Sequence, residues 1–226
     1  MRARPARAPA RHWPDRPEVT GGLDVQAGGS WMAVNQAGLF ATLLNGLQSL
    51  GPVAGKRSRG ELPLNALNFT AAADAAQALE RLDPRAYRAF NLIIADAGAV
   101  FLLQNDGQRP IQRGEVPPGL HLISHRDLND PRDPRVRQFR HAFGQLPRPN
   151  QGDTLADWAP WAALMGTREG EDPENALTAL TIRTDFGFET RCTAFVGLHA
   201  DRPPVWWHRE GQENPQSLSQ FHKIPL

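Results

Sequence analysis

Hydrophobic positions along this chain fall in short stretches separated by glycine, proline and polar residues. Apolar residues dominate positions 31–35 and 39–45, and we predict two strands there, joined by a turn in which Gly38 supplies the positive φ. Positions 90–95 are apolar almost throughout, which is typical of a strand buried on both faces. Further strands are predicted at 100–103, 119–124, 180–183, 192–198 and 205–208. Adjacent tryptophans at 206 and 207 must face opposite sides of the last strand.

Three segments have the periodicity of helices. Residues 71–82 are alanine-rich, with small and apolar side chains on one stripe. Residues 134–143 and 155–165 each follow an acidic capping candidate, Asp133 and Asp153. Another helix is expected to start near Ser58, three residues before Glu61. The order of strands, helix, strands, two helices and strands predicts an α+β protein with mainly antiparallel sheets.

No linker or repeat divides the chain, so we expect one domain over residues 1–226. Its first 18 residues are rich in arginine and proline. Prolines at 5, 9, 14 and 17 prevent the amphipathic helix of a transit peptide, and an extended surface leader is expected instead.

Composition narrows the classes of function. The net charge of +1 gives no bulk attraction to nucleic acid or to anionic membranes. The single cysteine, Cys192, excludes an internal disulfide and fits a reducing compartment. No apolar run approaches the roughly 18 residues that span a bilayer. A cytoplasmic protein with a small-molecule ligand, without nucleic acid and without an integral membrane segment, is therefore expected.

Glycine pairs, a tryptophan and a basic loop form the most specific pattern in the chain. The segments read Gly21-Gly22-Leu23-Asp24, Gly28-Gly29-Ser30-Trp31, Lys56-Arg57-Ser58-Arg59-Gly60-Glu61 and Phe90-Asn91-Leu92-Ile93-Ile94-Ala95-Asp96. This pattern resembles the NRDE family, also called the transport and Golgi organisation family, which is similar to the N-terminal-nucleophile hydrolases. The resemblance implies a four-layer αββα sandwich of mainly antiparallel sheets.

Members of that family usually begin with Met-Cys, run through a first strand and reach Asn-Arg-Asp-Glu. This chain begins Met1-Arg2, so we expect it to lack that strand and motif. An N-terminal nucleophile needs Cys, Ser or Thr at the mature first position, where the α-amine acts as base. The chain as written is therefore expected not to be catalytic. The alternatives are an amidohydrolase whose true start lies upstream, or a structural remnant with an uncovered sheet edge.

The resemblance also points to ligand-binding residues. A distant comparison with the bile-salt-hydrolase branch of this fold marks Asn45, His125 and Arg191, and Arg59 belongs to the family pattern at a helix start. Animal members are linked to haem and lipid trafficking, so the resemblance implies a small amphipathic ligand such as haem or a lipid or acyl-CoA. Arginines and His125 would meet its carboxylate, and tryptophans would cover its apolar part. No metal and no resident cofactor is expected, with haem only as a ligand.

Several residues have a second interpretation. Cys192 is either a thiol nucleophile or a small buried side chain in a strand. Ser30 is either released by autoproteolysis or part of a tight bend at Gly29. His121 and His125 have the spacing of a metal pair. Asn45 could also form a turn, and Arg191 could form an ion pair within the sheet.

Overall fold

The computed structural model describes residues 5–149, 153–211 and 217–226, and two antiparallel sheets dominate it. The larger sheet has seven strands in the order β1-β2-β3-β4-β5-β6-β7, and the smaller has three in the order β10-β9-β8. The large sheet consists of β1 (Ala6–Ala10), β2 (Val19–Asp24), β3 (Met32–Asn35), β4 (Phe40–Asn45), β5 (Phe90–Ala95), β6 (Val100–Asn105) and β7 (Gln112–Glu115). The small sheet consists of β8 (Cys192–Gly197), β9 (Val205–Glu210) and β10 (His222–Lys223).

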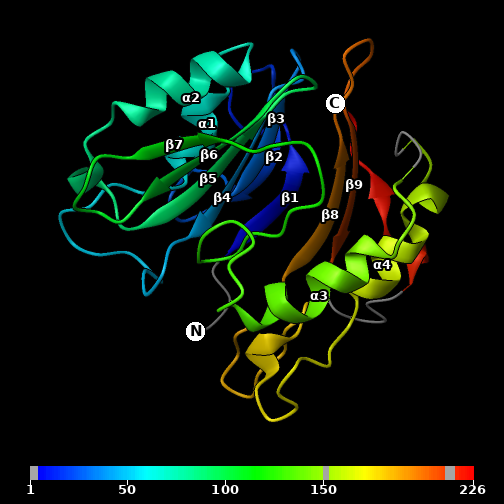
Figure 1. Cartoon of the computed structure of the whole chain (residues 1–226). Helices are drawn as coiled ribbons and strands as arrows, with labels where there is room; N and C mark the ends of the chain where they lie inside the picture. Colours follow the sequence, from blue (N-terminus) through cyan, green and yellow to red (C-terminus); the bar gives the residue numbers. More distant parts are fainter. Residues whose placement is uncertain (1–4, 150–152, 212–216) are drawn as a thin grey trace.

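Helices cover the outer face of each sheet (Figure 1). The α-helices are α1 (Glu61–Ala66), α2 (Ala72–Glu80), α3 (Pro134–Gly144) and α4 (Ala159–Met165), with 3-10 turns η1 (Pro84–Ala86), η2 (Leu155–Trp158), η3 (Ala176–Thr178) and η4 (Leu218–Gln220). Helices α1 and α2 lie on the large sheet, the small sheet stacks on its other face, and α3 and α4 lie beyond. The structure therefore has four layers in the order αββα, which confirms the expected α+β class.

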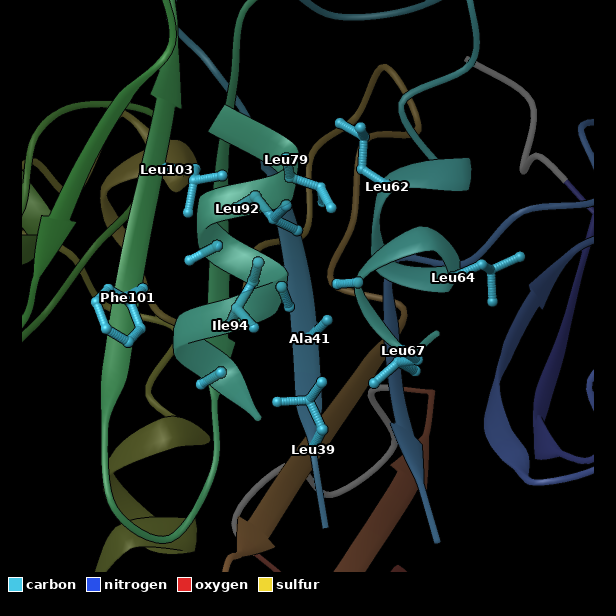
Figure 2. Packing of buried hydrophobic residues seen from close by; sticks show 14 of the residues in the cluster. Leu39, Ala41, Leu62, Leu64, Leu67, Leu79, Leu92, Ile94, Phe101 and Leu103 are labelled. Atoms are coloured by element: carbon cyan, nitrogen blue, oxygen red, sulfur yellow. The ribbon is translucent and has the colours of Figure 1, made fainter. Parts of the chain in front are cut away.

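The main hydrophobic core lies between α1, α2 and the large sheet (Figure 2). Phe90, Leu92 and Ile94 project from β5 into this core, because alternate residues of a strand share a face. Asn91, between the first two, faces the other side and contacts the loop that follows β7. The same strand thus supplies both the packing of the fold and a polar anchor near a cavity.

Two smaller apolar clusters join neighbouring layers of the fold. Val34 of β3 packs with Trp206 of β9 and Ile224, which joins the two sheets. Phe195 of β8 packs with Ala162 of α4 and with Trp207, which joins the small sheet to its helices. Trp206 and Trp207 therefore face opposite layers, as their adjacent positions predicted.

Several expected elements are confirmed with small shifts in their bounds. The hairpin of β3 and β4 turns at Gly38, whose φ is 85°. Strand β5 has the predicted bounds, and α2 covers most of residues 71–82. Helix α3 begins after Asp133, whose carboxylate accepts a hydrogen bond from the backbone N–H of Arg135 at 2.8 Å, so this capping prediction is also confirmed.

Other predictions were wrong. Residues 119–124 form no strand, because the backbone N–H of Leu122 bonds the side chain of Asn129 instead of a neighbouring strand. Residues 180–183 contribute only an isolated bridge between Arg183 and Glu189. The segment 155–165 divides into η2 and α4, and its cap is Thr154 rather than Asp153.

The start of the chain and the start of α1 also differ from expectation. The leader was expected as an extended surface segment; its residues Ala6–Ala10 are extended and mostly exposed, but they also pair with β2 as the edge strand β1, which was not predicted. Proline is compatible with an edge strand because its missing N–H is not needed there. Helix α1 begins at Glu61 after Gly60, without a side-chain cap from Ser58.

Candidate functional site

The first candidate site is a cavity of about 400 Å³ between the two sheets, here called the inter-sheet cavity. Strands β1, β8 and β9 and the bend before β3 contribute its walls. Its lining residues are Ala6, Arg7, Trp31, Glu189, Thr190, Arg191, Cys192, His208, Glu210 and Gly211. Apolar and charged groups thus meet in one hollow of the size usual for small-molecule sites, roughly 300–1,000 Å³.

His208 is the most unusual group in the inter-sheet cavity. Its side chain is 2% exposed, and neither ring nitrogen has a hydrogen-bond partner among the described residues. Burial, together with the nearby His222, lowers the pKa of His208 from 6.5 to about 4, so the ring is neutral at physiological pH. A neutral imidazole has one donor and one acceptor, and leaving both unsatisfied in a protein interior is costly. Both nitrogens are themselves buried, so a group in the cavity would reach them only after the imidazole turned toward it.

Cys192 lies on the same side of the small sheet as His208. Cys192 pairs with Glu210 and Ala194 pairs with His208, so both side chains belong to the face that meets the large sheet. Burial, followed by the charge of Glu210, raises the pKa of the Cys192 thiol. A neutral thiol is a weak nucleophile. Cys192 is half-buried, and its neutral thiol favours the interpretation as a small structural side chain in the strand.

Arg191 and Arg7 bring positive charge to the inter-sheet cavity. Arg191 forms an ion pair with Glu189 at 3.2 Å, and its side chain remains 59% exposed. Such an exposed pair is weak and open to exchange with an incoming anion.

The second candidate site is a cavity of about 310 Å³ beside the ends of β4, β5 and β6, here called the polar cavity. Its lining is mostly amide and charged groups. The residues are Gly46, Leu47, Ala89, Asn91, Gln104, Asn105, Asp106, Arg109, Pro110, Gln112, His125, Arg126, Asp127, Asp130 and Arg132. Several of the charges are already paired: Arg109 with Asp106 at 2.6 Å, and Arg132 with Asp130 at 2.7 Å.

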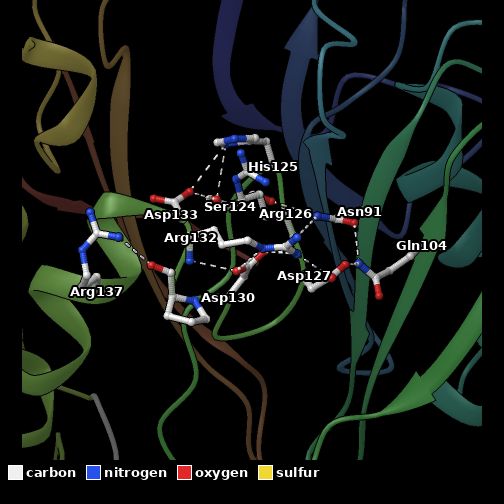
Figure 3. Close-up of polar contacts among 11 residues, drawn as sticks. Asn91, Gln104, Ser124, His125, Arg126, Asp127, Asp130, Arg132, Asp133 and Arg137 are labelled. Carbon is white, nitrogen blue, oxygen red and sulfur yellow. Dashed lines mark hydrogen bonds and ion pairs between the residues drawn. The ribbon is translucent and has the colours of Figure 1, made fainter.

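Asn91 fixes the loop that carries His125 (Figure 3). Its amide donates hydrogen bonds to the carbonyls of Ser124, at 2.9 Å, and Arg126, at 2.7 Å, on either side of the histidine. Gln104 donates to the Asn91 carbonyl at 3.2 Å and to Asp127 at 3.1 Å. The loop is therefore positioned by polar side chains of β5 and β6.

His125 lies beside the buried carboxylate of Asp133. The distance from His125 Nδ1 to Asp133 Oδ2 is 3.6 Å, and Ser124 Oγ donates a hydrogen bond to the same carboxylate (Figure 3). Burial lowers the pKa of His125, and the charges of Arg135 and Arg126 add to this, whereas Asp133 opposes it. Ser124 Oγ also lies 3.4 Å from His125 Nδ1, so one ring nitrogen faces both the hydroxyl and the carboxylate. A nucleophilic triad uses the two ring nitrogens separately, so the group is not arranged as one. Sequence reasoning found Asp133 only as a helix cap, because Ser124 lies nine positions earlier in the chain.

The four residues expected to bind the ligand do not form one site. Asn45 lies exposed at the end of β4, next to Gly46 of the polar cavity. Arg59 donates to Ser49 Oγ at 2.8 Å and to the Ala89 carbonyl at 2.7 Å, which fixes a loop at the rim of that cavity. His125 lies in the polar cavity and Arg191 in the inter-sheet cavity. Trp31 and His208, which sequence reasoning did not mark as site residues, complete the latter.

The histidine pair His121 and His125 is not arranged as a metal site. The His121 ring hydrogen-bonds the Pro117 carbonyl at 2.9 Å and the Asn129 amide at 2.8 Å. Within residues 5–149, 153–211 and 217–226, no group of three or more His, Cys, Asp or Glu side chains could hold a metal ion.

Ser30 is 1% exposed and lies in a tight bend. Its N–H donates to the Gly60 carbonyl at 2.8 Å, and its hydroxyl donates to the Met32 carbonyl at 2.9 Å. Met1, to which the expectation about a missing nucleophile applies, lies outside the described residues. In the part of the chain that the structure describes, no helix has the length and apolar character needed to cross a membrane.

Comparisons with known proteins place this architecture in a family. A "Transport and Golgi organization protein 2 homolog" from Bos taurus is 33% identical over 139 residues, which are 57% of this chain and 48% of the relative. The chain thus spans about half the length of the curated relative it matches. Among solved structures, two single-residue variants of the conjugated bile acid hydrolase from Clostridium perfringens align with 92% of this chain and 81% of theirs. Their identities are 12% and 13% and their TM-scores 0.43 and 0.42, and neither assigns a role to a residue here. Residues 1–202 match the family described as Transport and Golgi organisation 2, and the chain belongs to that family.

Proposed function

We propose that this protein binds a small amphipathic ligand in the inter-sheet cavity. The observation that carries the proposal is His208, which is buried at 2% exposure, lines the cavity and has no partner for either ring nitrogen among the described residues. Buried polar groups in native proteins are nearly always satisfied by protein, water or ligand. A ligand with a hydrogen-bonding group would supply these partners once the His208 ring turned toward the cavity, since both nitrogens are buried as placed.

The rest of the lining fits the two ends of such a ligand. Trp31 and Ala6 offer apolar surface. Arg191 and Arg7 could meet a carboxylate or phosphate in exchange for Glu189 and Glu210, which balance their charge in the same lining. Haem and acyl-CoA both combine an apolar body with anionic groups. Histidine is a residue type that binds haem iron axially, and His208 could take this role if its buried ring turned toward the cavity, whereas the neutral thiol of Cys192 could not act as a thiolate ligand.

Titration of the purified protein with hemin and with a long-chain acyl-CoA tests the proposal. We expect saturable binding of at least one, followed by the Soret band for hemin and by tryptophan fluorescence for the acyl-CoA. His208→Gln should weaken this binding about tenfold or more, since a hydrogen bond or ligand to the buried ring is lost. His141→Gln, on the exposed side of α3, is the matched control and should leave binding unchanged.

Two outcomes would contradict the proposal. One is the absence of saturable binding of both compounds to wild-type protein. The other is equal affinity of wild type and the His208 variant, with Trp31→Phe also unchanged, since binding would then occur outside the inter-sheet cavity.

A further inference from the structure

The loop between β4 and α1 exposes an unusual share of apolar surface. Seven large hydrophobic side chains are exposed in the part of the chain that the structure describes, and three of them lie on this loop. Leu47 is 49% exposed, Leu50 59% and Val53 48%. We call residues 46–57 the apolar loop. Single exposed hydrophobic residues are normal, but a group on one short segment marks an interaction surface.

The apolar loop is held in shape by bonds to its backbone. Arg88 donates hydrogen bonds to the carbonyls of Gln48 at 3.0 Å, of Gly51 at 2.9 Å and of Leu50. Ser49 Oγ lies 2.8 Å from the Gly46 carbonyl oxygen and 2.7 Å from the Ala89 carbonyl oxygen, and its single hydroxyl hydrogen can be donated to either. These bonds engage the carbonyls of four loop residues. The exposed side chains are thus presented by a fixed segment rather than by a loose one.

Positive charge surrounds these side chains. Residues 46–60 contain no acidic residue but include Lys56, Arg57 and Arg59. Lys56 reaches the Arg85 carbonyl and Arg88 bonds the loop itself, so two further cations from the segment after α2 adjoin it. Glu61 pairs with Arg57 at 2.7 Å, and the other cations still leave a local excess of positive charge at the apolar loop, although the whole chain is nearly neutral.

We propose that the apolar loop docks this protein on the surface of anionic lipid bilayers. Leu50 and Val53 would enter the headgroup region, and the exposed Lys56, Arg57 and Arg85 would meet lipid phosphates. Leu50 and Val53 line neither of the two cavities described above, so a broad surface suits them better than a small ligand. Exposed aliphatic side chains beside cations are the combination that binds peripheral proteins to anionic membranes.

Flotation with vesicles tests this docking. We expect the purified protein to bind vesicles of phosphatidylcholine with phosphatidylserine, and to bind vesicles of phosphatidylcholine alone much less. The double variant Leu50→Ser/Val53→Ser should bind the anionic vesicles about tenfold more weakly, because apolar insertion is lost. Lys56→Glu should also weaken binding at low salt, and high salt should weaken wild-type binding by screening.

The control is Val25→Ser/Leu177→Ser, which removes aliphatic side chains that are 45% and 43% exposed outside the apolar loop. Its vesicle binding should equal that of wild type, and circular dichroism should show all variants folded. The proposal is overturned if wild-type protein does not bind anionic vesicles. It is equally overturned if the two double variants bind alike, since docking would then not depend on this loop.

Discussion

At the scale of single residues, burial determines the pKa of His208 and so its charge. The pattern of the sequence marks it only as a position in a strand, yet it lines the inter-sheet cavity at 2% exposure. His125, which the sequence did mark, keeps 38% of its side chain exposed beside Asp133. Both residues are histidines, so the sequence does not distinguish them. The packing of the surrounding layers determines how exposed each imidazole is.

His208 predicts a pH dependence of stability. Burial lowers its native pKa to about 4, below the ordinary value of 6.5, so the unfolded chain takes up this proton first as the pH falls. The free energy of unfolding should be at its plateau above about pH 6.5 and decrease towards pH 4, by on the order of 3 kcal/mol. Chemical denaturation at several pH values would measure this.

The matched variant is His208→Gln, in which the decrease between about pH 6.5 and pH 4 should become clearly smaller, and His125, whose pKa burial also lowers, accounts for part of what remains. Asp106 and Asp130, whose pKa values are about 2, also make the protein less stable as the pH falls, but only around and below 3.8, the ordinary pKa of Asp. Their effect on stability is therefore separated in pH from that of His208. An unchanged slope in the variant would show that His208 is not the group that titrates.

At the scale of elements, the bend before β3 depends on a close approach of two glycines. A Cβ on Gly29 would lie 2.5 Å from the Gly60 carbonyl carbon and 2.6 Å from its oxygen. We expect Gly29→Ala to destabilise the protein by about 1–3 kcal/mol, since backbone must move to relieve the clash. Gly114→Ala on β7 is the control, because no heavy atom lies within 4 Å of its Cβ position, and it should change stability by less than about 0.5 kcal/mol.

Denaturant unfolding of both glycine variants at one pH compares them directly. If the two variants are equally stable, the backbone of the bend and the backbone at the start of α1 lie farther apart in solution than in the structure.

Elements with local signals were predicted well, and those that depend on distant partners were not. The apolar run of β5 and the alanine stripe of α2 carry their own pattern, so both were found. Strand β1 was missed because arginine and proline mask it, and residues 11–18 separate it from its partner β2. Residues 119–124 were predicted as a strand because they contain apolar side chains. The side chain of Asn129, however, accepts the hydrogen bond of the Leu122 backbone N–H, which a neighbouring strand would otherwise accept.

The same distinction applies to the candidate sites. Arg191 was expected to bind a ligand, and it does lie in a cavity, but its neighbours Trp31 and His208 come from other elements. Those elements are far apart in the sequence and meet only because the two sheets stack. No local spacing of residues could therefore predict this site. Whether Asn45, Arg59, His125 and Arg191 bind a ligand remains a prediction, and their distribution over two cavities means that one ligand would not meet all four.

At the scale of the whole molecule, the two sheets are joined by a much smaller apolar contact than the one beneath α1 and α2. The main core includes buried residues from Val19 to Ile111, whereas the contact between the sheets has three buried members, Val34, Trp206 and Ile224. The large sheet and its helices therefore have a core of their own, and the small sheet depends on Trp206 for its attachment.

This inequality predicts how Trp206→Ala behaves. Removing a tryptophan that is 1% exposed should lower the free energy of unfolding by about 3–5 kcal/mol. The loss should also be uneven: in hydrogen exchange, amides of β8 and β9 should lose protection while those of β4, β5 and β6 keep most of theirs. Leu92→Ala, in the main core, should instead lower protection in all of these strands, because the small sheet cannot remain folded on a disordered large sheet. Uniform loss of protection in the Trp206 variant would mean that the four layers unfold as one cooperative unit, and that the inter-sheet cavity opens only when the whole protein unfolds.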